Sequence, residues 1–260
     1  MSSQGSLKAR VGESGGPPLI GLFCSTPAPL TVELIAAAGF DFVVIDLEHT
    51  LIDGPTLNAM LLAARASGIA ALVRVAATHQ IVQVLDAGAQ GVVVPRVRSV
   101  HEARMAVQAA RHAPLGHRGL NSTPGSGFGR DDLAHAVQCA AADTLVVVMI
   151  EDRGGLDALD AIASVEGVDV LLGGAADLSQ DFGLPWQTGH ADVRAALARI
   201  EAVARTHGKT FCGLPRNTDD IAALHRSGVR LLIAGDDRGI ARRAMAAQWR
   251  ACLQDFHGNP

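Results

Sequence analysis

The sequence has few charged residues: Asp, Glu, Lys and Arg make up 18% of its 260 residues, and the formal net charge is -4. The Lys and Arg residues are scattered and form no basic stripe, which excludes nucleic acid as an expected partner. No apolar run reaches the ~18 residues of a membrane span. The polar start lacks the apolar core of a secretory signal. We therefore expect a cytoplasmic protein with no membrane partner.

Paired cysteines are also missing. The four cysteines are far apart in the sequence, at Cys24, Cys139, Cys212 and Cys252. No CxxC pair is available for a structural zinc site, and we expect four reduced thiols. Apolar residues, by contrast, make up 48% of the chain, which excludes global disorder. A chain of this length can bury one large core or two small ones.

Short runs rich in Val, Ile and Leu alternate along the chain with longer amphipathic stretches. The runs are nearly continuous, as is typical of strands that are buried on both faces of a parallel sheet. The predicted strands are Leu19–Cys24, Phe42–Ile45, Ala71–Val75, Gly91–Pro95, Leu145–Ile150, Val168–Leu172, Thr210–Gly213 and Leu231–Ala234.

The stretches between these runs have the apolar spacing of helices. Four of them end just before Gly68, Gly88, Gly208 or Gly228, where a left-handed helix cap favours glycine. The predicted helices are Thr31–Ala38, Thr56–Ala66, His79–Ala87, Val100–His112, Leu156–Ser164, Asp192–His207, Asp219–Ser227 and Gly239–Leu253.

Strict alternation of strands and helices over about 240 residues predicts a (β/α)8 TIM barrel, a closed parallel sheet in one domain. The alternative is a doubly wound open sheet. That fold usually has a glycine-rich turn after its first strand, where this chain has Ser25-Thr26-Pro27. We expect residues 1–17 to form a flexible tail and residues 18–260 to form the barrel domain.

One segment interrupts the alternation. Residues 114–130 are rich in Gly, Pro and Ser, and an extra helix is predicted after them at about 131–142. A long loop in a compact domain is often a lid or a binding loop, although a solvated connection is the alternative. The GxGxG string in it does not follow a strand, which argues against a dinucleotide site.

Polar residues follow the predicted strands at their carboxyl ends, where a TIM barrel has its active site. They are Asp46, Glu48, His49, Arg74, Glu151, Asp177, Asp236 and Asp237. Each has a structural alternative. Arg74 could pair with Asp46 or Glu48 and close the barrel, because a buried arginine needs a partner. Asp177 could cap a short helix, and His49 could be an ordinary rim histidine.

The carboxylates of Glu151 and Asp177 suit a hard divalent cation, Mg²⁺ first, with Mn²⁺ or Co²⁺ as alternatives. A cation beside Arg74 would stabilise the enolate of a 2-oxo acid, and His49, held by an acid, would transfer protons. Ala176 and the small residues around it leave backbone N–H groups open to a substrate carboxylate. Lysine is absent from the strand ends, which disfavours a Schiff-base aldolase.

These residues resemble the HpcH/HpaI family of metal-dependent aldolases, from about Leu19 to Leu253. The segments that carry the resemblance are Gly39-Phe40-Asp41-Phe42, Ile45-Asp46-Leu47-Glu48-His49, Val73-Arg74-Val75, Leu85-Asp86-Ala87-Gly88-Ala89-Gln90-Gly91, Val94-Pro95, Glu151, Val165-Glu166-Gly167-Val168-Asp169 and Asp177-Leu178-Ser179.

The resemblance implies a pyruvate enolate that adds reversibly to an aldehyde. It implies Glu151 and Asp177 as metal ligands, Arg74 at the keto oxygen, and His49, oriented by Asp46, as the acid and base. Ala176, Asp177 and Glu48 would bind substrate, the first two through their backbone N–H groups. The family usually forms a hexamer, a trimer of dimers, in which the C-terminal helices make contacts between subunits.

The sequence departs from the aldolase pattern at Met149, where aldolases of the family commonly have Gln, and at Ala175, where they commonly have Pro. Arg118–Ser122, Met149–Asp152 and Gly174–Gln180 are similar to a side branch that condenses oxaloacetate with acetyl-CoA, giving citrate for siderophore biosynthesis. The 2-oxo acid would then be the electrophile. A non-catalytic barrel subunit is a third hypothesis, and the presence of both predicted ligands and of Arg74 argues against it.

Overall fold

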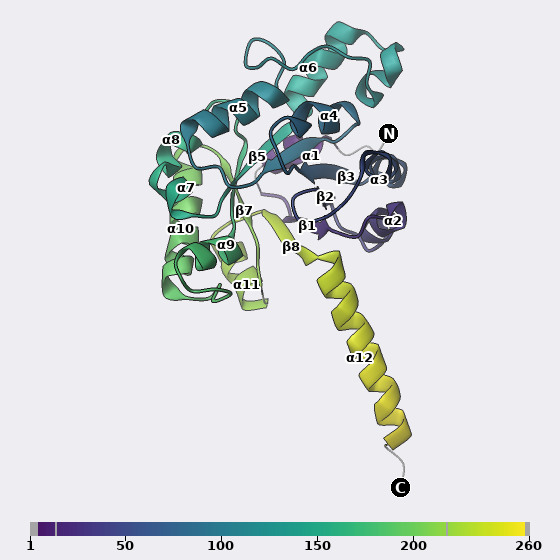
Figure 1. Ribbon diagram of the computed structural model, residues 1–260, viewed down its shortest axis with the longest axis vertical. Helices are drawn as coiled ribbons and strands as arrows, with labels where there is room; N and C mark the ends of the chain where they lie inside the picture. The colour runs from purple at the N-terminus through teal and green to yellow at the C-terminus, as the bar shows by residue number, and fades with distance from the viewer. Residues whose placement is uncertain (1–4, 14, 217, 258–260) are drawn as a thin grey trace.

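The computed structural model describes residues 5–13, 15–216 and 218–257. Within these ranges the strands form one closed, all-parallel barrel in the order β1 to β8 (Figure 1). This confirms the predicted (β/α)8 fold. The strands are β1 (Leu19–Cys24), β2 (Phe42–Asp46), β3 (Ala70–Arg74), β4 (Gly91–Val94), β5 (Leu145–Ile150), β6 (Val170–Gly173), β7 (Thr210–Gly213) and β8 (Leu231–Asp236).

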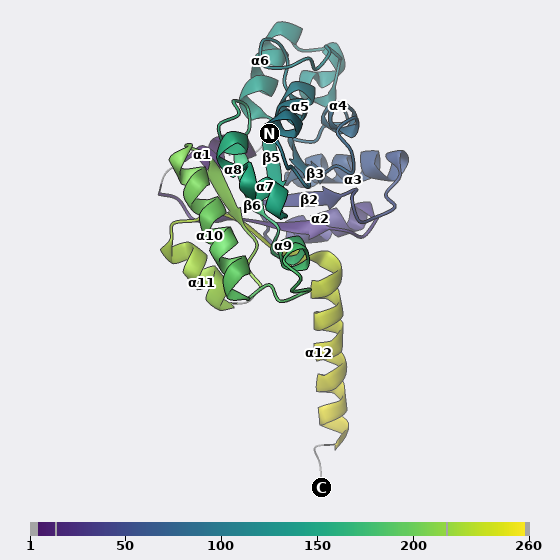
Figure 2. The same ribbon diagram turned by 60° about the vertical axis from the view of Figure 1, so that its left-hand side comes forward.

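Helices surround the barrel, and α12 projects away from it in both views (Figures 1 and 2). No helix within the described ranges combines the length and the apolar character that a bilayer span requires. The helices are α1 (Leu7–Gly12), α2 (Pro29–Ala37), α3 (Gly54–Ser67), α4 (Gln80–Asp86), α5 (Val100–Ala110), η1 (Pro124–Gly129), α6 (Leu133–Asp143), α7 (Arg153–Asp157), α8 (Leu159–Ala163), α9 (Ala175–Asp181), α10 (Ala191–Thr206), α11 (Thr218–Arg226) and α12 (Asp237–His257).

The helices that follow β5 and β6 differ from the sequence prediction. The helix expected over Leu156–Ser164 is two short helices, α7 and α8, which meet at Ala158. Gly154 and Gly155 lie in α7, and glycine is a poor helix former. The set of predicted helices does not include α9, although a short helix capped by Asp177 is one alternative. This helix follows β6 directly and carries Asp177 in its first turn.

Buried side chains alternate between two apolar layers along each strand. Phe42 and Val44 point into the barrel, whereas Val43 and Ile45 pack against the surrounding helices. The interior is tightly filled: a Cβ added at Gly21 would lie 2.2 Å from the Phe42 ring. The barrel is therefore a packed core rather than a channel.

The N-terminal segment is partly ordered, so the expectation of a loose tail over residues 1–17 is wrong for α1. Leu7 is only 2% exposed and packs with Val11 against the barrel interior. Lys8 pairs with Asp169 at 2.8 Å, and Arg10 pairs with Asp41. One buried leucine is too weak a pattern to predict a six-residue helix from the sequence. Helix α1 is held instead by its tertiary contacts with the barrel. Residues 1–4 and Ser14 lie outside the described residues.

The long loop after α5 is fixed to the end of α4 by an ion pair. Arg118, which is 9% exposed, donates to Asp86 at 2.8 Å, and Asn121 donates to the same carboxylate at 3.1 Å. The extra helix predicted after the loop is present as α6. It has no buried residue and lies on the outside of the molecule (Figure 2).

A second buried arginine joins three elements at the amino end of the barrel. Arg111, 4% exposed, donates to the carbonyl of Thr144 at 2.8 Å, to that of Gly167 at 3.1 Å and to Asp169 at 2.6 Å. Asp169 in turn accepts the backbone N–H of Val146 at 2.8 Å. These bonds tie the end of α5 to the starts of β5 and β6.

We expect Arg111→Met to lower the free energy of unfolding by about 3 kcal/mol, because it removes the ion pair with Asp169 and leaves the carbonyls of Thr144 and Gly167 without this donor. Urea unfolding followed by circular dichroism measures this. The control is Arg130→Met, which breaks an exposed pair with Asp131 and should cost less than about 0.5 kcal/mol. Equal effects of the two substitutions would contradict the structural role of Arg111.

Candidate active site

The site is built around an ion pair at the carboxyl rim of the barrel. Asp46 ends β2 and Arg74 ends β3, and the two are partners in the register of these strands. Arg74 donates from Nε and Nη2 to the two oxygens of Asp46, both at 2.8 Å. Burial disfavours the Asp46 carboxylate, but the bonds and charge of Arg74 outweigh burial and hold the pKa of Asp46 below its usual value.

Arg74 is held on its remaining sides as well. Its Nη1 lies 3.4 Å from Oε2 of Glu48, and its guanidinium stacks over the ring of Phe23 at 4.6 Å. The ion pair that the sequence offered as a structural alternative is therefore present. It also fixes the direction of the guanidinium. A donor that is held in place in this way can stabilise a negative charge as it develops.

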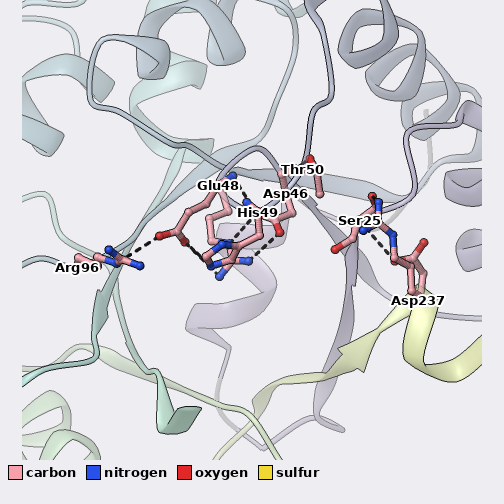
Figure 3. Close-up of polar contacts among 9 residues, drawn as sticks. Ser25, Asp46, Glu48, His49, Thr50, Arg96 and Asp237 are labelled. Carbon is pink, nitrogen blue, oxygen red and sulfur yellow. Dashed lines mark hydrogen bonds and ion pairs between the residues drawn. The ribbon is translucent and has the colours of Figure 1, made fainter. Parts of the chain in front are cut away.

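His49 is placed differently from the expectation that Asp46 orients its ring. Asp46 Oδ1 accepts the backbone N–H of Glu48 at 3.0 Å and that of His49 at 3.4 Å. The His49 imidazole instead lies 3.5 Å from Glu48 through Nε2, and its side chain is 53% exposed (Figure 3). Arg74 and two backbone donors already occupy Asp46, so Glu48 is the acid beside the ring.

Glu48 is the point where two arginines and the His49 imidazole meet. Besides Arg74 and His49, its carboxylate contacts Arg96, whose Nε lies 3.5 Å from Oε1 (Figure 3). Arg96 is not among the site residues predicted from the sequence. The available signal was its position directly after Pro95, at the carboxyl end of the fourth predicted strand.

Glu151 follows β5 and is only 3% exposed. Its Oε1 accepts the backbone N–H of Arg96 at 2.7 Å. Burial, followed by the nearby charges of Asp177 and Glu48, raises the pKa of Glu151 to about 7. A Cβ added at Gly174 would lie 2.6 Å from Glu151 Oε2, so a glycine there makes room for the carboxylate.

Asp177 lies in the first turn of α9, next to Glu151, and is half-buried. It does not cap the helix, whose N-cap is Gly174. The backbone N–H groups of Ala176 and Asp177 lie in that first turn, where N–H groups have no partner within the helix. In the part of the chain that the structure describes, no three His, Cys, Asp or Glu side chains are grouped to hold a metal. A cation here would have two protein carboxylates and take its other ligands from substrate or water.

Catalytic groups in a TIM barrel come from the carboxyl ends of several different strands. Here four consecutive strands, β2 to β5, end in or just before the residues that meet at the rim. The chain is thus an enzyme of the TIM-barrel type. Residues 19–244 match the HpcH/HpaI aldolase/citrate lyase family, and the chain belongs to that family.

Named relatives act on 2-oxo acids. The 4-hydroxy-4-methyl-2-oxoglutarate aldolase cghB of Chaetomium globosum is 37% identical over 227 residues, which cover 84% of each chain. The hydroxypyruvate/pyruvate aldolase of Roseobacter denitrificans is 34% identical over 244 residues, 91% of this chain and 94% of that protein. The crystal structure of citrate synthase SbnG matches with a TM-score of 0.89 and 42% identity, over 97% of this chain and 99% of that one.

The raised pKa of Glu151 has a consequence for stability. The folded pKa, about 7, is above the ordinary 4.5, so the native state holds the proton more tightly and loses stability as pH rises between these values. In EDTA, Glu151→Gln should therefore be more stable than the unmodified protein by up to about 3 kcal/mol at pH 8, and no more stable at pH 4.

Urea unfolding at the two pH values measures this difference. Glu166→Gln changes an exposed glutamate and is the matched control, with no expected pH-dependent gain. If the gain of Glu151→Gln is the same at both pH values, burial does not hold the Glu151 carboxyl in its protonated form.

Proposed function

We propose that this enzyme condenses oxaloacetate with acetyl-CoA and releases citrate and CoA, the second of the two activities that the sequence left open. The observation that carries the proposal is the near full-length similarity to citrate synthase SbnG, at 42% identity. The aldolases cited above are 34% and 37% identical over smaller shares of the chain.

Met149 supports this choice. Its side chain is 3% exposed and packs in the barrel interior, two residues before Glu151. A glutamine at this position, as in the aldolases that the sequence resembles, would add hydrogen-bonding groups beside the carboxylates. Methionine offers only a weakly accepting sulfur.

Arg74 is the residue that we assign to the keto oxygen of oxaloacetate. Asp46 and Phe23 hold its guanidinium in place before substrate arrives. Its N–H groups would stabilise the negative charge that develops on that oxygen when the new carbon–carbon bond forms. The backbone N–H groups of Ala176 and Asp177 would bind the carboxylate next to the keto group.

His49 is the residue that we assign to proton transfer. Its Nε2 would take a proton from the acetyl methyl group, whose carbon then adds to the keto carbon. Glu48, 3.5 Å from that nitrogen, would stabilise the imidazolium. The keto oxygen takes up the proton of the imidazolium, which restores neutral His49. Water then hydrolyses the resulting citryl thioester to citrate and CoA.

Glu151 and Asp177 are the residues that would hold a divalent cation, with Mg²⁺ first among the candidates. The residues fit a cation, because the buried Glu151 carboxylate lies next to that of Asp177 and Gly174 leaves room beside it. A bound cation would supply positive charge that polarises the keto group of the 2-oxo acid.

Subunit association through α12 is part of the proposal. Met245 and Trp249, four residues apart on this helix, are 70% and 65% exposed. Apolar side chains at this spacing form one stripe along a helix. They support a homo-oligomer, a hexamer by family resemblance, in which α12 contacts a neighbouring subunit.

A second candidate function is the reversible aldol reaction of pyruvate with an aldehyde. The observation in its favour is that two relatives, whose matches cover 84% and 91% of this chain, are named as aldolases. The two functions differ in the role of the 2-oxo acid: it is the nucleophile in the aldol reaction and the electrophile in the condensation.

The first test is thiol release from acetyl-CoA. We expect release only when oxaloacetate is present, with citrate as the product, and a loss of about 10²- to 10³-fold in kcat/KM for Arg74→Met. Proton NMR of the pyruvate methyl group in D₂O is the companion measurement. Rapid deuterium exchange without any thiol release would identify the aldolase activity instead.

The metal assignment has its own test. We expect Glu151→Gln to abolish Mn²⁺ binding, measured by titration calorimetry, while the far-ultraviolet circular dichroism of the barrel is unchanged. Glu166→Gln is the matched control and should bind as the unmodified protein does. Full Mn²⁺ affinity in Glu151→Gln would refute the ligand assignment. Full thiol release by EDTA-treated protein would show that the reaction does not need the cation. Glu151 would then act as an acid that faces the substrate.

A further inference from the structure

Arg96 has an unusual backbone conformation for its residue type. Its φ is +53°, in the left-handed region. Among the non-glycine residues that the structure describes, only Phe128 and Trp186 also have a positive φ. A side chain destabilises this conformation, which glycine adopts freely. Strained residues of this kind gather at functional sites, where surrounding contacts hold them.

One of those contacts belongs to the backbone. The left-handed turn directs the Arg96 N–H at Oε1 of Glu151, at 2.7 Å. A glycine would make the same bond with less strain. The backbone contact therefore does not account for an arginine side chain at this position.

The side chain extends across the rim of the site. Its Nε lies 3.5 Å from Glu48 Oε1 (Figure 3). The backbone N–H of the same residue bonds to Glu151. A ligand bound between Glu48 and Glu151 would therefore lie alongside the Arg96 side chain. The side chain is 54% exposed, and Glu48 is its only ion-pair partner within the described ranges. Glu48 has Arg74 and His49 as further partners and can release Arg96 to an incoming anion.

The three other arginines that lie at or just after the ends of β3, β4 and β5 are already occupied. Arg74 is bound to Asp46 through two bonds, Arg98 pairs with Asp152, and Arg153 bonds to Asp181. Among these four arginines, Arg96 is the one whose guanidinium has a single ion-pair contact, at 3.5 Å, and no hydrogen bond in the described part of the chain. Its Nη groups are thus available for the paired hydrogen bonds that arginine makes with a carboxylate.

We propose that Arg96 is a specificity-determining residue that binds the second carboxylate of a four-carbon 2-oxo acid and so selects dicarboxylic over monocarboxylic substrates. The inference rests on the proposed function, since it requires a 2-oxo acid between Glu151, Asp177 and Arg74. The carboxylate next to the keto group binds at α9, and the distal carboxylate lies against the Arg96 guanidinium.

The test compares malate with lactate, which differ by one carboxylate and do not react in the proposed condensation. Titration calorimetry on the full chain in Mg²⁺ gives both affinities. Arg96→Gly keeps the N–H to Glu151 and relieves the backbone strain. We expect it to weaken malate binding by about 10- to 100-fold, to leave lactate binding within about twofold, and to raise the midpoint of urea unfolding.

The control is Arg98→Gln, which changes an arginine that is 58% exposed and pairs with Asp152; it should leave both affinities unchanged. Equal weakening of malate and lactate, or no change in either, would overturn the assignment. If the unmodified protein binds neither acid, the 2-oxo acid site itself is wrong, and the assignment falls with it. If malate selection depends on Arg96 but acetyl-CoA releases no thiol, only the condensation is wrong.

Discussion

The bond between Asp46 and Arg74 is the constraint on which the rest of the site depends. Two charged groups at the top of a packed barrel are each costly to bury alone, and the two parallel bonds between them offset that cost. The same carboxylate accepts the backbone N–H groups of Glu48 and His49. One interaction thus fixes both the Arg74 guanidinium at the rim and the start of the loop that carries His49.

The acidic residues of the rim are held by different partners. Arginine charge lowers the pKa of Asp46, whereas burial beside other acids raises that of Glu151. Residues with similar side chains therefore differ in their readiness to carry charge. The first is a permanent anion that positions its neighbours, and the second responds to whatever cation or proton enters the site.

The fold and most rim positions could be predicted from the sequence because they follow from strong local patterns. A strand buried on both faces, such as Phe42–Asp46 or Leu145–Ile150, leaves a continuous apolar run, and the residue after it must lie at the rim. The direction of the His49 ring could not be predicted, because it depends on which groups already occupy Asp46. Arg96 was missed for a similar reason: a positive φ depends on tertiary contacts that no residue pattern records.

The small helix α1 limits where ligands can enter and leave the barrel. Leu7 and Val11 close the amino end of a barrel whose interior is already filled with side chains. Substrates and products can then reach and leave the site only at the carboxyl rim of the barrel. In the proposed condensation, oxaloacetate, the thioester, CoA and citrate would all use this one route. A closed amino end thereby makes both substrates and both products share the same entrance to the site.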